Sequence, residues 1–514
     1  MRLRLAPKDL GEPRDASRSL RPNNRALGSL PYNNSDRMPP TQSQPTVAIA
    51  GGGLAGLAAA CALSDAGFRV TLFEKRPFLG GRASSWEHPG TGEVVDNCQH
   101  VLFRVCTNLI EFYQRIGVAG QIRWYDEMTF IEPGGRTSVM KSSPLPAPLH
   151  TAPSFLGFSF LSPADKFAIA RALVPLTLRA QRDTGQSFQQ WLDQHGQTRH
   201  AVDCFWRPIL VSALSEELDL ISISAAAQVV RESMKSPAAR HMGVPTVPLT
   251  DLYNKAGDYI RARAGMLHFR RPVESFVADS SHVRVNLREQ KEDESDSKAA
   301  FDYFVVALPF DALGRILPDA PQSAPLREHI RHFENSPITG IHLWFDRQIS
   351  DLDHAVLLDR TIQWMFHKSR LQPMRTQATS GSPSGSYIEL VVSSSKTLIA
   401  RSLPEIVELV LAEVREFFPA ARAANLVKST VIKEVNATYS PRPGIDAHRP
   451  AAATAWPRVF LAGDWTATGW PATMESAVRS GYLSAEALAR AAGFKDSRFL
   501  SPDLPASGFM RLFT

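Results

Sequence analysis

The sequence of 514 residues contains only four cysteines, and none of them stands in a CxxC pair. Their wide spacing lacks the pattern of a zinc site and of a disulfide framework. We therefore predict no metal centre, and a protein of the reducing cytoplasm.

The first 46 residues lack a continuous apolar stretch and are rich in proline, asparagine, serine and arginine. A secretory signal needs an apolar core, and a transit peptide avoids the acidic residues that this segment contains. The composition is typical of disorder, so we predict a disordered tail over residues 1–45.

The chain also has little excess charge beyond that tail. Its formal net charge is +6, but eight Lys and Arg face only four acids within the first 46 residues, which leaves roughly +2 for the remainder. No basic stripe with interleaved aromatic residues follows, as a nucleic-acid partner would require. We therefore predict no nucleic-acid binding.

Long hydrophobic runs are missing as well. Residues 47–64 are uncharged and approach transmembrane length, but their glycines and alanines suit a buried strand, a turn and a helix better than a lipid-facing span. We expect a strand at Thr46–Ala50, a helix at Leu54–Ala66 and a second strand at Arg69–Phe73. This βαβ beginning implies a parallel sheet covered by helices.

The turn between the first strand and the helix reads GGGLAG, a GxGxxG motif over residues 51–56. Gly51 permits a tight turn, Gly53 lets the backbone approach a pyrophosphate, and Gly56 brings the helix against the strand. A helix N-terminus attracts phosphates, so we also assign Leu54 and Ala55 to cofactor contact.

Glu74 ends the second strand, where a carboxylate can accept both hydroxyls of a ribose, and Lys75 follows it. NAD and FAD both fit this half-site. The next motif, Gly80-Gly81-Arg82, supplies a second close-approach pair and a guanidinium suited to bidentate phosphate contact. A surface turn with a solvated arginine is the alternative.

This arrangement resembles the amine oxidase and phytoene desaturase superfamily of FAD enzymes, in which the doublet and its arginine pack on the pyrophosphate. The resemblance implies non-covalent FAD. It further implies a backbone contact of Val273 with adenine, and a C-terminal motif in which Gly463 and Asp464 approach the ribityl chain and phosphates. Thr473 and Met474 would open a helix whose positive end stabilises charge on the flavin.

A narrower resemblance rests on residues 95–102, 106–109, 211–214, 247–252 and 468–473. These segments are similar to those of the hydroxysqualene dehydroxylases of hopanoid synthesis, also called squalene-associated FAD-dependent desaturases. The resemblance covers residues 46–491 and implies reduction of an allylic C30 alcohol to squalene, by protonation of the hydroxyl and hydride transfer from flavin N5. The electron donor is not indicated.

His100 and Asp96 are the candidate catalytic residues, because they enter the substrate region directly after the first FAD half-site. The alternative is a structural cluster that hydrogen-bonds the flavin or ties two domains together. Three further functions remain open: a carotenoid-type desaturase, a flavin amine oxidase with Trp465 and Trp470 near the ring, and a prenyl-lipid carrier that keeps the Rossmann frame without catalysis.

The substrate class implies contact with a membrane, since a C30 isoprenoid lipid partitions into bilayers. Residues 155–161 read FLGFSFL and lead into a helix with basic residues, which suits an interfacial element at the inner face of the cytoplasmic membrane. Core packing is the alternative. The ending Phe509–Phe513 is a second candidate.

We therefore expect an α/β fold, with a Rossmann-type FAD-binding domain and a discontinuous α+β substrate domain. The expected FAD-binding parts are 46–105, 250–330 and 425–492, the expected substrate parts are 106–249 and 331–424, and the expected C-terminal tail is 493–514. Further expected elements include helices at Ala164–Arg182, Leu403–Phe417 and Met474–Leu488, strands at Val283–Leu287, Tyr303–Ala307 and Tyr387–Ser393, and loops at Arg288–Ala300 and Gln377–Ser386.

Overall fold

The computed structural model describes residues 44–90, 92–288, 298–373 and 385–513. The tail expected over residues 1–45 lies outside the described residues except for Gln44 and Pro45. Both expected loops lie largely outside them as well. Of their described residues, those from Lys298 onward belong to β13 (Lys298–Phe301) and Ser386 begins β18, so these are strand rather than loop.

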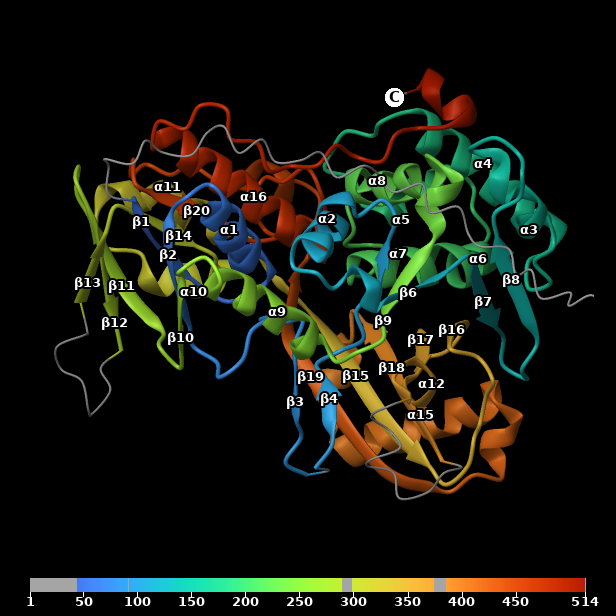
Figure 1. Cartoon of the computed structure of the whole chain (residues 1–514). Coiled ribbons are helices and arrows are strands. Elements are labelled where there is room, and N and C mark those ends of the chain that lie inside the picture. Colours follow the sequence, from blue (N-terminus) through green and yellow to red (C-terminus); the bar gives the residue numbers. More distant parts are fainter. Residues whose placement is uncertain (1–43, 91, 289–297, 374–384, 514) are drawn as a thin grey trace, which may run out of the picture. The chain divides into compact units, whose positions relative to one another are not determined.

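A parallel sheet of five strands, in the order β10-β2-β1-β14-β20, forms the first layer (Figure 1). Its strands are β1 (Thr46–Ala50), β2 (Arg69–Glu74), β10 (Met266–Phe269), β14 (Tyr303–Val306) and β20 (Val459–Leu461). The central strands are apolar on both faces because both faces are covered. The βαβ beginning is confirmed, since β1 pairs in parallel with β2.

Helices cover one face of this sheet, and a small antiparallel sheet with two helices covers the other. The first cover consists of α1 (Leu54–Asp65), α2 (Thr107–Arg115), α9 (Leu249–Arg261) and α16 (Met474–Ala491). The second consists of β11 (Val273–Ala278), β12 (Val283–Leu287), β13, α10 (Phe310–Ile316) and α11 (Ala324–Ile330). Alternate residues of β1 enter the two cores, as a strand requires.

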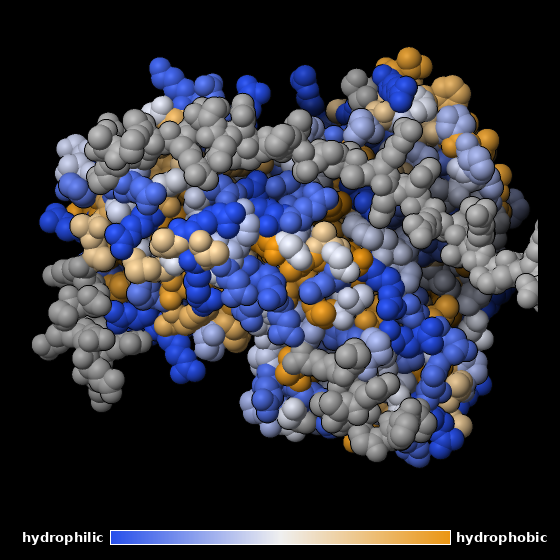
Figure 2. Space-filling view, viewed as in Figure 1, coloured by the Kyte–Doolittle hydropathy of each residue, from blue (hydrophilic) through white to orange (hydrophobic). Residues whose placement is uncertain are grey.

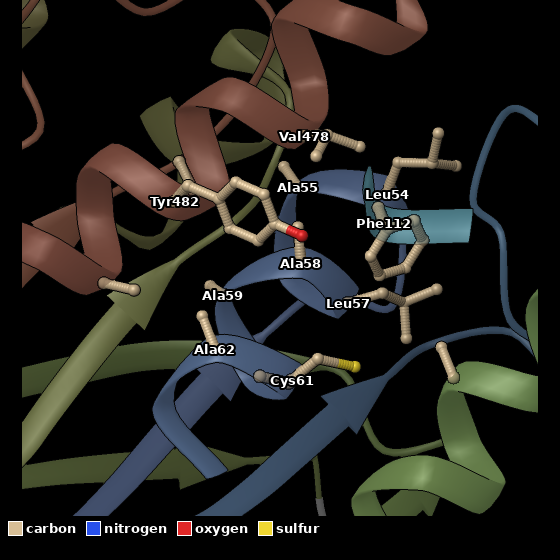
Figure 3. Packing of buried hydrophobic residues seen from close by; sticks show 14 of the residues in the cluster. Leu54, Ala55, Leu57, Ala58, Ala59, Cys61, Ala62, Phe112, Val478 and Tyr482 are labelled. Carbon is tan, nitrogen blue, oxygen red and sulfur yellow. The ribbon is translucent and has the colours of Figure 1, made fainter. Parts of the chain in front are cut away.

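Small residues allow α1 and α16 to approach closely, as Figure 3 shows. Ala55, Ala58 and Ala59 of α1 face α16, where a Cβ added to Gly481 would lie 2.3 Å from the Ala55 carbonyl oxygen. Phe112 and Tyr482 fill the space around them. The uncharged run that could be mistaken for a membrane span is therefore a buried strand, turn and helix.

A mixed sheet of seven strands, in the order β19-β15-β18-β17-β16-β7-β8, forms the substrate side. Its strands are β7 (Glu127–Ile131), β8 (Thr137–Lys141), β15 (Asn335–Phe345), β16 (His354–Leu357), β17 (Trp364–His367), β18 (Ser386–Ser393) and β19 (Leu426–Tyr439). The helix α15 (Leu403–Phe417) packs on it. Because β19 pairs with β15 along its length, residues 426–439 lie in the substrate sheet, not in the FAD-binding part where the sequence suggested them.

A helical layer adjoins this sheet and encloses its own apolar core. It consists of α3 (Ala152–Leu156), α4 (Pro163–Leu178), α5 (Phe188–Gln194), α6 (Arg199–Ala201), the π-helical turn η4 (Val202–Trp206), α7 (Arg207–Leu214) and α8 (Ile223–Met234). Phe155, Phe158, Phe160 and Leu161 are buried in this core. The expectation that these aromatic side chains form an interfacial element is therefore wrong, since core packing accounts for them.

Shorter elements connect the layers. They are β3 (Ser85–Glu87), β4 (Val94–Asp96), β5 (Leu102–Phe103), β6 (Ile122–Tyr125), β9 (Met242–Pro245), α12 (Lys368–Leu371), α14 (Lys396–Ile399) and the 3-10 helices η2 (Ala119–Gln121), η3 (Leu149–Thr151), η5 (Pro237–Arg240), η7 (Pro321–Ser323), η8 (Pro419–Arg422), η9 (Ile445–His448) and η10 (Gly508–Leu512).

Two further boundaries differ from the expectation. The helix α2 shares the core of α1 and α16, so it belongs with the nucleotide sheet although the substrate part was expected to begin at 106. The C-terminal segment packs back on the chain rather than forming a tail, because Phe499 and Met510 are buried and the Ser501 amide donates to the Asn108 side chain. Among the described helices, none combines the length and the apolar character needed to cross a bilayer.

Candidate functional site

A single cavity of about 1030 Å³ begins at the carboxyl ends of the parallel strands and continues to the seven-stranded sheet. Residues that follow all five strands line it, namely Gly51, Lys75, Arg270, Ala307, and Gly463 with Asp464. This is the edge at which open parallel sheets bind their ligands. The volume is at the upper end of the range for cofactor and ligand sites, about 300–1,000 Å³.

The GxGxxG turn has the geometry that a pyrophosphate site needs. Gly51 has φ +107°, and a Cβ there would lie 2.5 Å from the Ala307 carbonyl oxygen. Gly53, Leu54 and Ala55 line the cavity, so the N-terminus of α1 faces it. Gly56 does not line it: a Cβ at Gly56 would lie 1.9 Å from the Gly51 oxygen, which confirms the close packing of helix on strand.

The second glycine pair packs directly on the first motif. The Gly80 amide donates to the Gly52 carbonyl at 2.9 Å, and a Cβ on Gly81 would lie 2.9 Å from the Gly53 Cα. Both glycines have positive φ, at +102° and +62°, and both line the cavity. The surface-turn alternative is therefore wrong: the two motifs form one cradle that side chains would fill, which is what a bound dinucleotide requires.

Glu74 is fixed at the end of β2 by backbone donors. Its carboxylate accepts hydrogen bonds from the amides of Gly52 at 2.6 Å and of Arg76 at 2.8 Å, and its side chain is buried at the cavity wall. A carboxylate has about four acceptor positions, so these two bonds orient it and leave capacity for ribose hydroxyls. Lys75 also lines this end.

Arg82 links the two distant halves of the nucleotide site. Its guanidinium donates to Asp464 at 2.7 Å and to the Ala437 carbonyl at 2.7 Å. The sequence suggested a bidentate phosphate contact, whereas here two of its nitrogens bind protein oxygens. Both Arg82 and Asp464 line the cavity, so the pair fixes the C-terminal motif against the glycine cradle.

The C-terminal motif ends in the expected helix N-terminus. Thr473 caps α16, because its hydroxyl accepts the Ser476 amide at 3.2 Å, and Thr473 and Met474 line the cavity. Gly463, with φ +152°, also lines it. The positive end of an 18-residue helix therefore faces the cavity.

Val273 lines the adenosine end, as expected, at the start of β11. The sequence did not single out its neighbours Arg270, Arg288, Pro309 and Arg315, which line the same end. The available signal was positional: Arg270 and Pro309 follow the parallel strands β10 and β14 at their carboxyl ends.

The opposite section of the cavity is mainly apolar. Its lining includes Val101, Ala213, Ile338, Trp364, Phe366 and Val391, which come from the 98–101 segment, α7 and three strands of the substrate sheet. The polar exceptions are Gln99, His100 and serines such as Ser212, whose hydroxyl accepts the Trp364 indole at 3.0 Å. The section suits a long hydrocarbon beside a few polar groups.

His100 lines this section, so the structure places one of the two catalytic candidates at the cavity. Its Nδ1 lies 2.6 Å from the Cys98 carbonyl oxygen, which can only accept. Nδ1 therefore carries the proton and the lone pair lies on Nε2. Burial lowers the pKa of His100 below its ordinary value, although the Cys98 hydrogen bond opposes this effect. Near neutral pH the side chain is a base, not an acid.

Asp96, the other candidate, does not line the cavity. Lys368 donates to its carboxylate at 2.6 Å, Ser85 at 2.5 Å and the Leu249 amide at 3.2 Å. Burial alone would raise the pKa of Asp96, but Lys368 holds it below its ordinary value. The geometry matches the structural alternative, in which the carboxylate ties segments together.

Lys368 is the centre of this buried cluster, and the sequence analysis missed it. Besides Asp96, it donates to the Gln99 side chain at 2.8 Å and lies 3.5 Å from Glu389. Burial raises the pKa of Glu389 to about 7, although Lys368 opposes the shift. Gln99 lines the cavity, so the cluster supports the cavity wall from behind. No local motif marks Lys368, because Asp96 is 272 residues away.

The amine oxidase alternative rested on two tryptophans, Trp465 and Trp470, which do not face the cavity. Trp465 and Trp470 are buried and neither lines it, and the Trp465 indole donates to the Leu308 carbonyl at 3.0 Å. Lys368 does not line it either. The described residues therefore place no aromatic cage from these two tryptophans at the substrate section.

Sequence comparison identifies similar proteins over most of the chain. The family model of the flavin-containing amine oxidoreductases matches residues 54–489. The 15-cis-phytoene desaturase of Synechococcus elongatus is 28% identical over 464 residues, which cover 86% of this chain and 95% of that protein. The probable zeta-carotene desaturase of the same organism is 28% identical over 479 residues, covering 87% and 98%.

Solved structures share the fold. Putrescine oxidase bound to putrescine superposes with a TM-score of 0.65 at 17% identity and covers 88% of this chain and 99% of its own. A putative protoporphyrinogen oxidase from Exiguobacterium sp. 255-15 has a TM-score of 0.61 at 15% identity, covering 88% and 100%. At these identities the likeness concerns the fold alone.

Proposed function

The chain belongs to the flavin-containing amine oxidoreductases, as an FAD-dependent oxidoreductase, and within this family we propose that it dehydrogenates a long polyisoprenoid hydrocarbon. We thus prefer the carotenoid-type desaturase alternative, which is an oxidation, to the reduction of hydroxysqualene that the sequence resemblance implied. The relatives at 28% identity are carotenoid desaturases that match almost end to end. The carrier without catalysis is set aside, because the family is one of oxidoreductases.

The single observation that carries this proposal is the position of His100, which lines the mainly apolar section of the cavity with its Nδ1 held 2.6 Å from the Cys98 carbonyl oxygen. Desaturation removes a hydride and a proton from neighbouring carbons, so it needs a hydride acceptor and a base. FAD, when bound, supplies the acceptor. His100 presents a lone pair on Nε2, and its lowered pKa keeps it unprotonated through neutral pH.

The other residues of the site have supporting roles. The glycine cradle and Glu74 would hold the adenosine and pyrophosphate, and the N-terminus of α16 would stabilise negative charge at the flavin. Trp364, Phe366 and Val391 exclude water from the hydrocarbon.

Dehydroxylation of hydroxysqualene is the second candidate. The segments that carry the resemblance converge in space: residues 98–101, Ser212 and Ala213, and Ala472 with Thr473 line one cavity, and Leu249 donates to Asp96 behind it. This reaction needs a proton donor for the leaving hydroxyl. Because burial lowers the pKa of His100, its side chain carries no proton on Nε2 to donate near neutral pH, which is why we place this reaction second.

Anaerobic incubations of the holoenzyme separate the two reactions. We expect phytoene, presented in vesicles, to bleach the oxidised flavin and to give a product with a longer polyene absorption. Reoxidation of the reduced flavin by hydroxysqualene, with squalene as product, would instead favour the second candidate. If neither lipid changes the flavin spectrum, the proposal fails.

A further inference from the structure

Large exposed apolar side chains gather around α3 and α4. Leu156 is 65% exposed, Phe167 73% and Val174 57%. Leu145 and Leu149, which precede α3, are also exposed, as are Phe509, Leu512 and Phe513 at the C-terminus. These eight are the majority of the fourteen exposed large hydrophobic residues among the described ones. Exposed apolar side chains that are concentrated on neighbouring elements indicate an interaction site.

The helix α4 carries large apolar side chains on its outward face as well as on its buried face. Its inward face buries Ile169, Ala172 and Leu176, as a surface helix should. Its outward face carries Phe167 and Val174, seven residues apart and hence on the same side, with exposed Ala170 and Arg171 between them. Large apolar side chains on the outward face of a surface helix, next to a cation, are expected against a lipid interface rather than in water.

Hydrogen bonds join the elements into one surface, which we call the α3–α4 patch. Lys166 of α4 donates to the Leu156 carbonyl of α3 at 2.7 Å. The Phe509 amide of η10 donates to the Ala147 carbonyl at 2.9 Å, which places the C-terminal segment beside residues 145–149. Figure 2 shows hydrophobic residues at the edge where Figure 1 places α3, α4 and the C-terminus.

The charge of these segments has one sign at the surface. Residues 141–156, 163–179 and 504–513 contain five basic residues, namely Lys141, Lys166, Arg171, Arg179 and Arg511. Their one acid, Asp165, is buried and accepts hydrogen bonds from its own helix cap at Ser162. The nearby exposed acid Glu127 pairs with Lys141. Apolar side chains flanked by cations match the interface of an anionic bilayer.

We propose that the α3–α4 patch docks the enzyme on the surface of an anionic phospholipid bilayer, as a peripheral and not a spanning protein. Its apolar side chains enter the acyl boundary, and its basic residues meet lipid phosphates. The aromatic side chains of the 155–161 segment are buried and do not contact the bilayer. Leu156, Phe167 and the exposed C-terminal residues provide the contact instead. Docking by this patch does not depend on which lipid is oxidised.

Vesicle sedimentation of the full-length holoenzyme tests the proposal. We expect binding to vesicles of phosphatidylcholine with phosphatidylglycerol, and weaker binding without phosphatidylglycerol or at high salt. The double variant Phe167→Ser/Leu512→Ser should lower the partition coefficient about tenfold to hundredfold, because two large apolar side chains no longer leave water. The variant Val277→Ser/Val427→Ser, with comparably exposed residues on other sheets, should bind like the wild type.

Equal binding by the two double variants would overturn the proposal, and so would absence of binding to anionic vesicles. A dimer that Phe167→Ser/Leu512→Ser converts to a monomer in size-exclusion chromatography, without vesicle binding, would make the patch a contact between two copies. Because the readout needs no turnover, a negative result here is distinct from failure of the proposed oxidation.

Discussion

The two ends of the cavity differ in what forms their surface: mainly glycine backbone at one end and side chains at the other. At the nucleotide end, glycine backbones at the carboxyl ends of parallel strands form the surface, and the Gly56, Gly80 and Gly81 positions have no room for a Cβ. At the substrate end, side chains from α7, β15, β17 and β18 form it. We therefore expect substitution of these glycines to disrupt the first end, whereas the second end should accept exchanges between apolar side chains of similar volume.

The largest effect is expected from Gly56→Ala at the nucleotide end. Its Cβ would lie 1.9 Å from the Gly51 oxygen, so α1 must shift and the cradle opens. Overpacking of this kind costs about 1–3 kcal/mol or more, and we expect the protein to be purified largely without flavin. The flavin-to-protein absorbance ratio measures this. Gly120→Ala, where nothing lies within 4 Å, is the matched control, and equal flavin content in both variants would contradict the prediction.

Lys368→Met is expected to have the next largest effect, on stability and not on the cradle. It leaves Asp96 as a buried charge without its cation, which costs about 3–5 kcal/mol of unfolding free energy. Urea unfolding checks this value. Adding Asp96→Asn should recover part of the loss, and the exposed Lys255→Met should change little. If the single variant is as stable as the wild type, the ion pair does not support the wall.

The same contrast explains what the sequence could predict. The motifs around Gly51, Glu74, Gly80 and Gly463 are local, because a tight turn or a close backbone approach demands glycine at a fixed spacing, and all of them line the cavity. His100 was found through its neighbourhood. Lys368 and Glu389 were not, because their partners lie far away along the chain and a buried ion pair has no local pattern.

The pairing of strands was a second feature that could not be predicted from the sequence. Periodicity predicted some of the helices and strands, with α15 and β12 found at their observed bounds. It did not mark others, such as α8 and α9. It could not assign Leu426–Tyr439 to a sheet, because an amphipathic strand fits either layer and only the long register with β15 decides. Likewise Phe155 and Phe158 look interfacial in sequence, yet the cap core accepts them.

At the substrate end, His100→Gln should lower the rate of hydrocarbon oxidation about a hundredfold, because a positioned base contributes roughly 10²–10⁴ to rate. Flavin content should stay normal, unlike in Gly56→Ala. Single-turnover bleaching of the flavin measures the step. Ser393→Ala, which alters another polar residue of the lining, is the control. Equal rates in the two variants would remove His100 from the chemistry and leave a structural role.

Wild-type activity should also depend on pH in one direction. Because burial lowers the pKa of His100, the base form persists through neutral pH, and activity should fall only on the acidic side, below the ordinary histidine range. A profile that instead rises on acidification would indicate a required acid, and would favour dehydroxylation.

The smallest effect is expected from Glu389→Gln. Glu389 lies in the same cluster as Lys368, but its substitution should stabilise the protein rather than destabilise it. The pKa of Glu389 is raised from 4.5 to about 7, so between these values the folded protein binds more protons than the unfolded chain. Its unfolding free energy must therefore fall as pH rises through this window. Glutamine does not titrate. The unfolding free energy of the variant should therefore rise relative to that of the wild type between about pH 5 and about pH 8, by roughly 1–3 kcal/mol. The exposed Glu408→Gln should show no such gain, and a loss that grows with pH in Glu389→Gln would mean that the carboxylate is needed ionised beside Lys368.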